Sequence, residues 1–503
     1  MAFQRNHVSD AERIAIGLHV YLYKSLYGLI TDLARKYVVS RWFIYYCYFQ
    51  FLLLLDLQKD KQESLAPQYG CCQNLEEQVV SLYLDTEASI SGIKRCVKTL
   101  FAQEVSTGRI SEILNEYGRS VESRETVTVR VKFISDEIFI GRPILVTVEP
   151  LSGHIIGLDL VDSRDKETWG ACWLELVDNE TGQIERIVAD QAKGLLGGIE
   201  LVCDDSEKIY QSDLFHVIMR LVSGICRAER KAYAAIGKEY DAAAKFERAK
   251  SERVLAKRLE KYETAKAKAE KWIQWYDESR YLFRELQEVL RMVNLKSGEL
   301  RRKADVMAEL EAILELLDQE IGDEKIQKGT GYIRDHQEAL LHYFDEVEAA
   351  AEFLNEAIVE DEVRQCLLRM YACQQQLYVA YGQRKRQLEA RWAALQESLV
   401  ARIGQAEYER VSQLVEQRLS AIIRSSSMVE NTNSRLRRFF DSARGQINQN
   451  RLNLIRFYLN HKPFERGRRQ GKSPDQLFHG DEAPAEHWLT ILRAKKAENA
   501  VGA

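Results

Sequence analysis

The stretch Val127-Thr-Val-Arg-Val-Lys-Phe-Ile-Ser-Asp136 decides the fold of the middle of this chain. Hydrophobic residues occupy every second position from Val127 to Phe133, and polar residues occupy the positions between them. A period of two is typical of a β-strand with one buried face. The sequence therefore predicts a strand that ends at Asp136 and places its carboxylate at the edge of a sheet.

The residues that follow predict the rest of an α/β layer. Ile144–Val148 and Ile155–Leu160 are short apolar runs separated by the turn Pro150–Gly153, which is the pattern of hairpin strands. Lys166–Leu176 gathers Trp169, Cys172, Trp173 and Leu176 on one face of a helix. Ile187–Ala189 then predicts a short buried strand that ends at a second aspartate, Asp190.

A long helical region follows this layer. No proline lies between Pro150 and Pro463, and residues 221–425 are rich in strong helix formers. The predicted breaks near Lys296–Gly298, Ile321–Asp323 and Lys328–Gly331 favour antiparallel helices joined by short loops, and one long coiled coil is the alternative. One buried helical stripe contains Val306, Leu310, Ile313, Leu314 and Leu317.

The first 120 residues are predicted to be helical, with two candidate helix-turn-helix motifs. Tyr27–Tyr37 and Arg41–Phe51 flank the link Val38-Val39-Ser40, in which Ser40 would cap the second helix. Val38 departs from the usual pattern, which often has glycine there. Lys94–Glu104 and Arg109–Tyr117 form the second candidate. Each motif either reads DNA, with Arg41 as a contact in the first, or is a pair of packed amphipathic helices.

Composition describes a globular protein with locally concentrated positive charge. The chain has 503 residues, 46% hydrophobic and 29% charged, with a net charge of -5. The segment from Asn431 to Lys472, however, contains eleven Lys and Arg residues and only two acidic residues. Such a segment favours contact with an anionic partner over a general basic surface.

Cysteine usage and the N-terminus point to the cytoplasm. The nine cysteines are scattered and form no CxxC pair, which argues against a disulfide framework and a structural zinc site. No secretory signal is apparent, and the most apolar run, Trp42–Leu55, is too short to cross a bilayer and is predicted to be a buried helix. We expect a cytoplasmic, nucleoid-associated protein.

Asp136, Asp190 and Glu430 are the candidate catalytic residues. Phosphodiester cleavage and strand transfer commonly use two Mg²⁺ ions about 3.5–4 Å apart. Protein sites hold Mg²⁺ with carboxylates, water and substrate phosphate. Aspartates that end two neighbouring parallel strands would meet at one edge of a sheet, although either one alone is more often a turn or capping residue.

The order of these segments resembles the catalytic core of DDE transposases, which have an RNase H-like fold. Glu430-Asn-Thr-Asn433-Ser-Arg-Leu-Arg437 is similar to the helix that supplies the third carboxylate in transposases of bacterial insertion sequences. Glu430, Asn433 and Arg437 fall on one face of that helix. Asn460–Phe464 and Arg468–Pro474 resemble the tail of the same group.

The resemblance implies further site residues. Asp213-Leu-Phe-His216 resembles a segment that follows the second aspartate in some insertion-sequence families, so His216 would orient a phosphate or a water, unless it is a core histidine. Charge makes the helix after Glu430 a candidate DNA contact, through Asn433, Arg435, Arg437, Arg438 and Arg444, with Arg451 and Arg456 on the same basic face. Trp272, Trp275 and Trp392 would either stack on a flipped base or pack the helical domain.

The sequence thus predicts an α+β, mainly α protein. An RNase H-like core, formed by residues 121–220 and 426–480, is interrupted by an all-helical insertion at residues 221–425. Residues 1–120 are the predicted DNA-binding region, and residues 481–503 are a C-terminal tail.

The resemblance implies a Mg²⁺-dependent DNA transposase, with Mn²⁺ as a substitute metal. It would act as a homo-oligomer on double-stranded transposon ends and target DNA. The alternatives are a transposase-derived DNA-binding or scaffolding protein without catalysis, and a purely helical scaffold, which would have no mixed sheet around residues 127–190.

Overall fold

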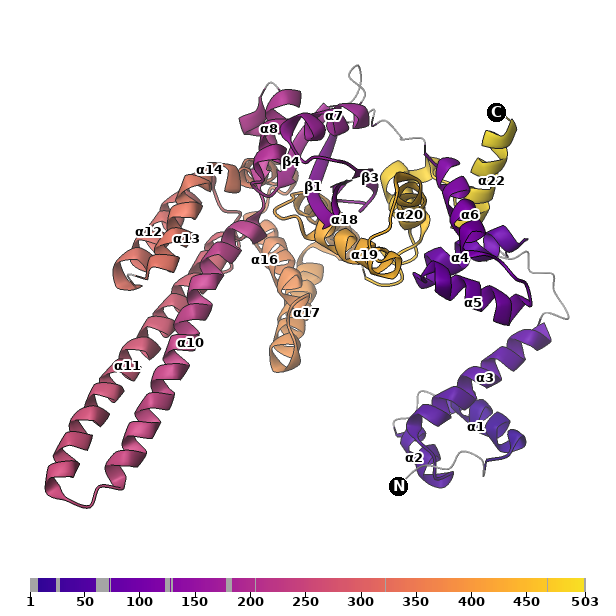
Figure 1. Ribbon diagram of the computed structural model, residues 1–503. Coiled ribbons are helices and arrows are strands. Elements are labelled where there is room, and N and C mark those ends of the chain that lie inside the picture. The colour runs from indigo at the N-terminus through magenta and orange to yellow at the C-terminus, as the bar shows by residue number, and fades with distance from the viewer. Residues whose placement is uncertain are drawn as a thin grey trace. The chain divides into compact units, whose positions relative to one another are not determined.

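The computed structural model describes residues 8–23, 28–59, 72, 74–122, 127, 130–177, 183–203, 205–321, 323–467 and 469–501 (Figure 1). The predicted positions Tyr27, Thr128, Val129 and Arg468 lie outside these residues. The chain divides into two compact units, Met1–Cys71 and Cys72–Ala503. The region expected to span residues 1–120 is therefore shared between both units.

The first unit consists of three helices around a small core of its own. Helices α1 (Asp10–Tyr23), α2 (Leu29–Lys36) and α3 (Arg41–Lys59) pack around Ile16, Phe43 and Ile44. Ser40 caps α3 as predicted, because its Oγ accepts a hydrogen bond from the Phe43 amide at 3.2 Å. Val38 adopts a left-handed backbone conformation with φ 52°, which is the conformation that favours glycine at this turn.

Helix α3 is confirmed as a helix but is buried on one side only. Phe43, Ile44 and Cys47 are buried, whereas Trp42 and Phe49 are 61% and 59% exposed. The prediction of a buried helix from Trp42 to Leu55 is therefore wrong for its outer face. None of the helices in the described part of the chain is long and apolar enough to span a membrane.

A five-stranded mixed sheet is the centre of the second unit. Its strands are β1 (Arg130–Ile140), β2 (Arg142–Val148), β3 (Ile155–Leu160), β4 (Gln183–Ala189) and β5 (Tyr210–Ser212). They lie in the order β3-β2-β1-β4-β5. β1 pairs antiparallel with β2 and parallel with β4, and β5 is parallel to β4. This sheet is consistent with an RNase H-like core and excludes the purely helical scaffold.

Helices cover both faces of the sheet. Because successive side chains of a strand point to opposite faces, Phe133 packs with Trp169 of α7 (Lys166–Leu176) and with α8 (Lys193–Val202). Ile134 instead joins Leu436 of α19 (Ser427–Ala443) and Leu454 of α20 (Gln449–His461). The third predicted carboxylate therefore enters the core on α19, on the face opposite α7.

The second candidate helix-turn-helix is part of this core. Helices α4 (Leu75–Thr86), α5 (Ile90–Phe101) and α6 (Thr107–Arg119) contribute Tyr83, Ile93 and Ile110 to the same hydrophobic cluster as α19 and α20. Arg109 of α6 forms an ion pair with Glu76 at 2.7 Å. These contacts favour the alternative of packed amphipathic helices.

The C-terminal segment is folded as well. After α21 (Pro474–His479) and a 3₁₀ turn at Gly480–Glu482, α22 (Trp488–Val501) packs against α4 and α6. Arg493 of α22 donates to both carboxylate oxygens of Glu77 at 2.8 Å. The residues expected to be a tail at 481–503 therefore include a helix of the core.

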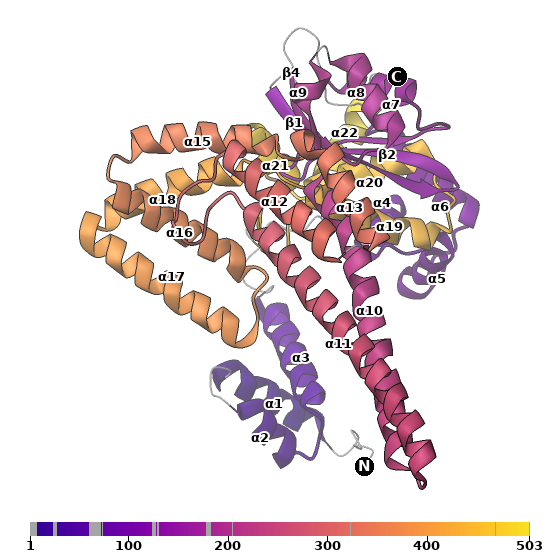
Figure 2. The same cartoon turned by 90° about the vertical axis from the view of Figure 1, so that its left-hand side faces the viewer.

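The insertion contains the helices α10 to α18. They are α10 (Leu214–Glu247), α11 (Glu252–Val289), α12 (Lys303–Ile321), α13 (Glu324–Asp335), α14 (Gln337–Leu340), α15 (Tyr343–Ala357), α16 (Asp361–Leu377), α17 (Gly382–Ile403) and α18 (Gln405–Ser420). Figures 1 and 2 show α10 and α11 as a long antiparallel hairpin and the others as shorter helices near its base. The hairpin combines features of both predicted arrangements, the bundle and the coiled coil.

Two predicted boundaries are wrong. The short helix α9 (Ser206–Ile209) and β5 are followed directly by α10, which begins at Leu214 and runs through residue 221 without a break. Helix α13 continues through Lys328–Gly331, where a loop was predicted. Gly329 faces α10 there, and a Cβ at this position would stand 3.1 Å from the Leu221 Cα. This glycine serves close helix packing and not a turn.

Candidate active site

Asp136 and Asp190 lie on neighbouring strands of the sheet. The parallel ladder between β1 and β4 ends with the pair Ser135 and Ala189, so the two aspartates follow at the same level. Asp190 ends its strand as predicted. Asp136 does not, because β1 continues to Ile140 and pairs Asp136 with Val146 of β2. The backbone of Asp136 is therefore hydrogen-bonded to β2, which lies on the opposite side of β1 from β4.

Hydrogen bonds fix both carboxylates. Asp136 Oδ1 accepts from the Glu137 amide at 2.8 Å, and Asp136 Oδ2 accepts from Asn433 Nδ2 at 2.6 Å. Asp190 Oδ1 accepts from the Ala192 amide at 3.0 Å, just before α8. These bonds orient the two groups while each retains acceptor capacity.

Glu430 reaches the same place from α19. It stands in the first turn of α19, and this helix packs across β1 and β2. Its Oε1 lies 3.8 Å from His216 Nε2, and its side chain is 43% exposed. Asn433, one turn farther along the helix, makes the hydrogen bond to Asp136. Helix α19 therefore brings both Glu430 and Asn433 to the aspartates.

The electrostatics of Asp136 reflect this convergence. The pKa of Asp136 is raised to about 6, mainly by burial and further by the negative charges of Glu430 and Asp190, which together outweigh the lowering effects of the Glu137 amide and His216. A carboxyl group responds in this way when like charges gather nearby. Asp136 therefore lies near enough to both Asp190 and Glu430 for their charges to affect it, although about 240 residues separate Asp190 from Glu430.

A second layer of contacts surrounds His216. Its Nδ1 is 2.6 Å from Asp213 Oδ2, and this bond is the main cause that raises the pKa of His216. Burial alone would raise the pKa of Asp213, but hydrogen bonds from His216, Ser426 and the Phe215 amide lower it overall. Since Asp213 is ionised, Nδ1 of His216 carries a proton and Nε2 faces Glu430.

Asp213 also joins the two ends of the insertion. It precedes α10, and its carboxylate accepts hydrogen bonds from the amide and the hydroxyl of Ser426, which precedes α19. Only the histidine of this segment was predicted as a site residue. The sequence feature that could have indicated Asp213 was its position as a helix cap three residues before His216.

A cavity of about 570 Å³ opens beside the cluster. Asp190, Asp213 and His216 line one part of it, and Arg220 and Tyr332 line another. The Arg220 guanidinium lies 5.0 Å from the centre of the Tyr332 ring. The cavity therefore combines acidic groups on the sheet side with a cation on the insertion side, which suits a phosphate beside bound metal.

The residues predicted to contact DNA fall into different environments. Arg437, Arg438 and Arg444 are exposed, with Arg438 3.5 Å from Glu87. Arg435 is partly buried, and this burial lowers its pKa. Asn433 is 1% exposed and contacts Asp136, which favours a role inside the site.

Arg451 and Arg456 do not belong to an exposed basic face. Both are 7% exposed. Arg451 donates to Ser111 Oγ at 2.8 Å and to the Gln446 carbonyl at 3.0 Å, and Arg456 donates to the Ile156 carbonyl at 3.5 Å. The prediction that these two arginines neutralise phosphates is wrong because α20 is buried in the core.

The remaining predicted contacts lie outside the cluster. Arg41 is exposed at the start of α3 in the first unit. Trp272 and Trp275 form an edge-to-face pair with ring centres 4.7 Å apart, and Lys231 Nζ lies 4.2 Å from the Trp272 ring. Trp275 and Trp392 pack against the hydrophobic core of the insertion, which favours core packing for both.

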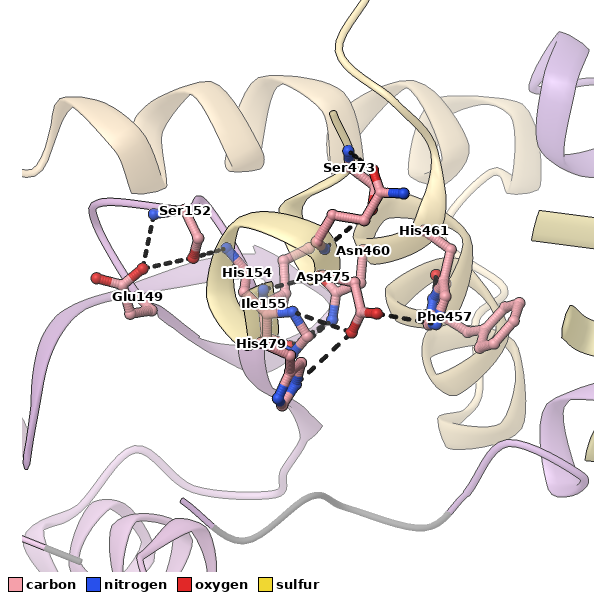
Figure 3. Close-up of polar contacts among 11 residues, drawn as sticks. Glu149, Ser152, His154, Ile155, Phe457, Asn460, His461, Ser473, Asp475 and His479 are labelled. Carbon is pink, nitrogen blue, oxygen red and sulfur yellow. Dashed lines mark hydrogen bonds and ion pairs between the residues drawn. The ribbon is translucent and has the colours of Figure 1, made fainter. Parts of the chain in front are cut away.

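The tail segment after α20 has a structural role (Figure 3). Asn460 pairs with the backbone of Ile155, accepting from its amide at 2.8 Å and donating to its carbonyl at 3.0 Å. Ser473 and Gln476 form a capping box at the start of α21. The Asn460 contacts fasten the segment that resembles the transposase tail to the start of β3.

His154, Asp475 and His479 place three potential metal-ligand atoms within 4.8 Å of one another. The two-point pairing of Asn460 with Ile155 fixes its amide, so Asn460 Nδ2 donates to His154 Nε2 at 3.2 Å. His154 Nδ1 must then carry the proton of the neutral ring, and it faces Asp475 Oδ1 at 3.8 Å. An N–H group cannot bind a metal, which argues against a metal site at this cluster.

Comparison with known protein families agrees with the geometry. Residues 136–360 match the family model of ISL3-type DDE transposases, described as Transposase. The chain carries an ISL3-family DDE transposase domain. The matched range begins at Asp136, contains Asp190 and His216, and ends before Glu430. No curated protein matches the chain. A domain of this transposase family implies DNA as the partner, and DDE transposases generally use a divalent metal ion.

Proposed function

We propose that this transposase cuts DNA at the ends of a mobile element and joins the released 3′-hydroxyl to target DNA. The convergence of Asp136, Asp190 and Glu430 supports this function most directly. These groups come from β1, from the end of β4 and from α19, and the pKa of Asp136 responds to both of the others. Three carboxylates held by rigid elements in one place are what two-metal phosphoryl chemistry needs.

The donor set suits Mg²⁺. Carboxylate oxygens are the ligands that this hard ion prefers, and a divalent cation would stabilise the ionised form of Asp136, which burial and the charges of Glu430 and Asp190 disfavour. In addition, Asn433 Oδ1 is buried without a hydrogen-bond partner next to Asp136. When bound by Asp136, Asp190 and Glu430, Mg²⁺ would activate the attacking oxygen and stabilise the leaving oxygen.

The other residues position the reacting groups. Asn433 holds the Asp136 carboxylate through Oδ2. Asp213 holds His216, whose Nε2 faces Glu430, so protonated His216 would offset part of the negative charge of the cluster. Arg220, placed over Tyr332, would contact the phosphate from the insertion side of the cavity.

We also propose the division of labour among the domains. Residues 121–213 and 426–480 would form the catalytic core, and the helical insertion that begins with α10 would cover the site. Arg41 in the first unit and Arg437, Arg438 and Arg444 on or beside α19 would contact DNA phosphates. Two DNA ends require two active sites, so we propose a homo-oligomer as the working form.

Cleavage of DNA that contains the element's ends tests the proposal. We expect wild-type protein with Mg²⁺ or Mn²⁺ to nick the end and expose a 3′-hydroxyl. Asp136→Asn, Asp190→Asn and Glu430→Gln should each lower the rate at least about 1,000-fold, because each removes an anionic ligand.

DNA binding by the same three variants in EDTA is the control, and it should be retained. Full cleavage activity in any one variant would refute the assigned role of that residue. Binding without cleavage in the wild type would instead favour a catalytically inactive DNA-binding protein.

A further inference from the structure

A second cavity, of about 660 Å³, lies at the base of the insertion and contains four arginines. Arg284 and Arg291 come from the end of α11 and the residues after it, Arg384 comes from α17, and Arg424 precedes α19. Leu214, Ile218 and Leu290 contribute apolar surface, with Gln287, Glu288 and Val379 completing the lining. We call this cavity the arginine groove.

The arginine groove has an excess of positive charge. Glu288 is the single acid of its lining, and it pairs with Arg291 at 2.8 Å. Among the described residues, no carboxylate lies within ion-pair distance of Arg284, Arg384 or Arg424. Three guanidinium groups around one cavity, without acidic partners, repel one another and favour an anionic ligand with several charges.

The groove and the catalytic cavity lie on opposite faces of one helix. Leu214 and Ile218 of α10 line the groove, whereas His216 and Arg220 line the catalytic cavity. Residues two positions apart on an α-helix point about 200° apart, which explains the two faces. The thickness of a helix, about 10–12 Å, equals the rise of roughly three base pairs of DNA.

A shared junction couples the two cavities. The Leu214 amide donates to the Arg424 carbonyl at 3.2 Å, and the next residue toward the N-terminus, Asp213, binds Ser426 and His216. The wall of the groove is therefore fixed to the elements that carry His216 and Glu430. A ligand in the groove would have a defined position relative to the catalytic carboxylates.

Exposed aromatic residues border the groove. Tyr378 and Tyr381, in the link between α16 and α17, are 60% and 87% exposed and flank Val379 of the lining. Tyrosine beside unpaired arginine is a frequent composition for nucleic-acid surfaces, because the ring contacts sugars or bases while the guanidinium contacts phosphate.

From these observations we propose that the arginine groove binds the sugar-phosphate backbone of duplex DNA, about three base pairs from the phosphate that is cut. This inference rests on the proposed function, which places DNA in the catalytic cavity. Arg284, Arg384 and Arg424 are the phosphate contacts. The groove sets the direction in which the duplex leaves the active site.

The test measures binding of the full-length chain to a 30-base-pair duplex of arbitrary sequence in EDTA, over a range of NaCl concentrations. Phosphate contacts carry no sequence information, so an arbitrary duplex is a sufficient probe. Arg284→Ala/Arg384→Ala should lower the slope of log K against log salt by about 1.8, since each lost contact contributes about 0.9. Affinity near 0.15 M salt should fall roughly 30-fold.

Two further variants make the result specific. Arg284→Lys/Arg384→Lys keeps both charges and should retain most of the slope. Arg253→Ala/Arg386→Ala removes two exposed arginines that lie outside the groove and should leave the slope unchanged. Because the changed side chains are exposed, all three variants should fold, as circular dichroism would verify.

An unchanged slope in Arg284→Ala/Arg384→Ala would overturn the proposal, as would an equal loss in Arg253→Ala/Arg386→Ala. Displacement of the duplex by inorganic phosphate at matched ionic strength, with no slope change in the groove variant, would also overturn it. The assay contains no metal and needs no cleavage, so its outcome is separate from that of the catalytic test.

Discussion

At the residue scale, the contact of Asn433 with Asp136 favours a positioning role over the predicted DNA contact. Its side chain is buried and donates to Asp136 Oδ2, the carboxylate that two neighbouring charges destabilise. Asn433 and Glu430 lie one turn apart on α19, so a single helix supplies one catalytic group and orients another.

We expect Asn433→Ala to lower the rate of DNA cleavage about 10- to 100-fold and to raise the Mg²⁺ concentration needed for half-maximal rate, as is common when a ligand loses its supporting hydrogen bond. A Mg²⁺ titration of cleavage measures both effects. Asn431→Ala, exposed on the same helix, is the matched control and should behave like wild type. Identical Mg²⁺ dependence in the two variants would contradict a positioning role.

His154 makes the stability of the second unit depend on pH. Burial lowers its pKa to about 3, with His479, His461 and Arg456 as further positive neighbours. The folded pKa lies below the unfolded value of about 6.5, so the unfolded chain binds the additional proton. The stabilisation is therefore complete above about pH 6.5 and is lost as the pH falls toward 3.

We predict that wild-type protein loses about 1–2 kcal/mol more unfolding free energy than His154→Gln when the pH changes from 7.5 to 5.0. Urea unfolding at the two pH values measures this difference. The variant will be less stable at pH 7.5, but the comparison uses only the change with pH. Equal changes in both proteins would show that His154 is not held neutral.

At the element scale, close helix packing depends on particular glycines. Gly118 of α6 faces α20, and a Cβ at this position would stand 1.9 Å from the Asn450 carbonyl oxygen. The Asn450 carbonyl belongs to the backbone of α20, which cannot move aside as a flexible side chain can. By contrast, a Cβ at Gly237 in α10 would meet no atom within 4 Å.

These two positions should respond in opposite directions to the same substitution. Gly118→Ala should destabilise the second unit by about 2–3 kcal/mol because α6 and α20 must separate. Gly237→Ala should stabilise α10 by roughly 0.5–1 kcal/mol because alanine has less freedom in the unfolded chain. Thermal unfolding and amide hydrogen exchange measure the two effects, and a stabilising Gly118→Ala would contradict the packing of α6 on α20.

At the scale of the whole molecule, the chain has two independent sets of cores. The hydrophobic cluster of the first unit contains only residues between Val8 and Tyr48, whereas the three clusters of the second unit contain only residues after Cys71. Each unit therefore buries its own apolar surface.

We predict that a shortened chain of residues 72–503 folds cooperatively, with a thermal midpoint within about 5 °C of that of the second unit in the full chain. Differential scanning calorimetry of both proteins provides the comparison. Its affinity for duplex DNA should be lower, because Arg41 and the remainder of the first unit are removed. Aggregation or a non-cooperative transition would show that the second unit needs residues 1–71.

The sequence by itself determined the local elements and the identity of the chemical groups. Alternation around Phe133 predicted β1, the N-cap at Ser40 predicted the start of α3, and the spacing of Glu430, Asn433 and Arg437 predicted α19. Patterns of this kind depend on residues within a few positions of one another. The sequence patterns also supported Asp136 and Asp190 as the ends of neighbouring strands, although four further residues of β1 follow Asp136.

Only the tertiary structure decided which of these residues meet. It buried Arg451 and Arg456, turned Asn433 toward Asp136, and joined Asp213 to Ser426 across the insertion. It also placed Gly329 against α10, where the sequence suggested a loop. Burial and partnership depend on packing between segments hundreds of residues apart, and no local pattern records that packing. The carboxylate cluster therefore needed the sequence for its members and the fold for their convergence.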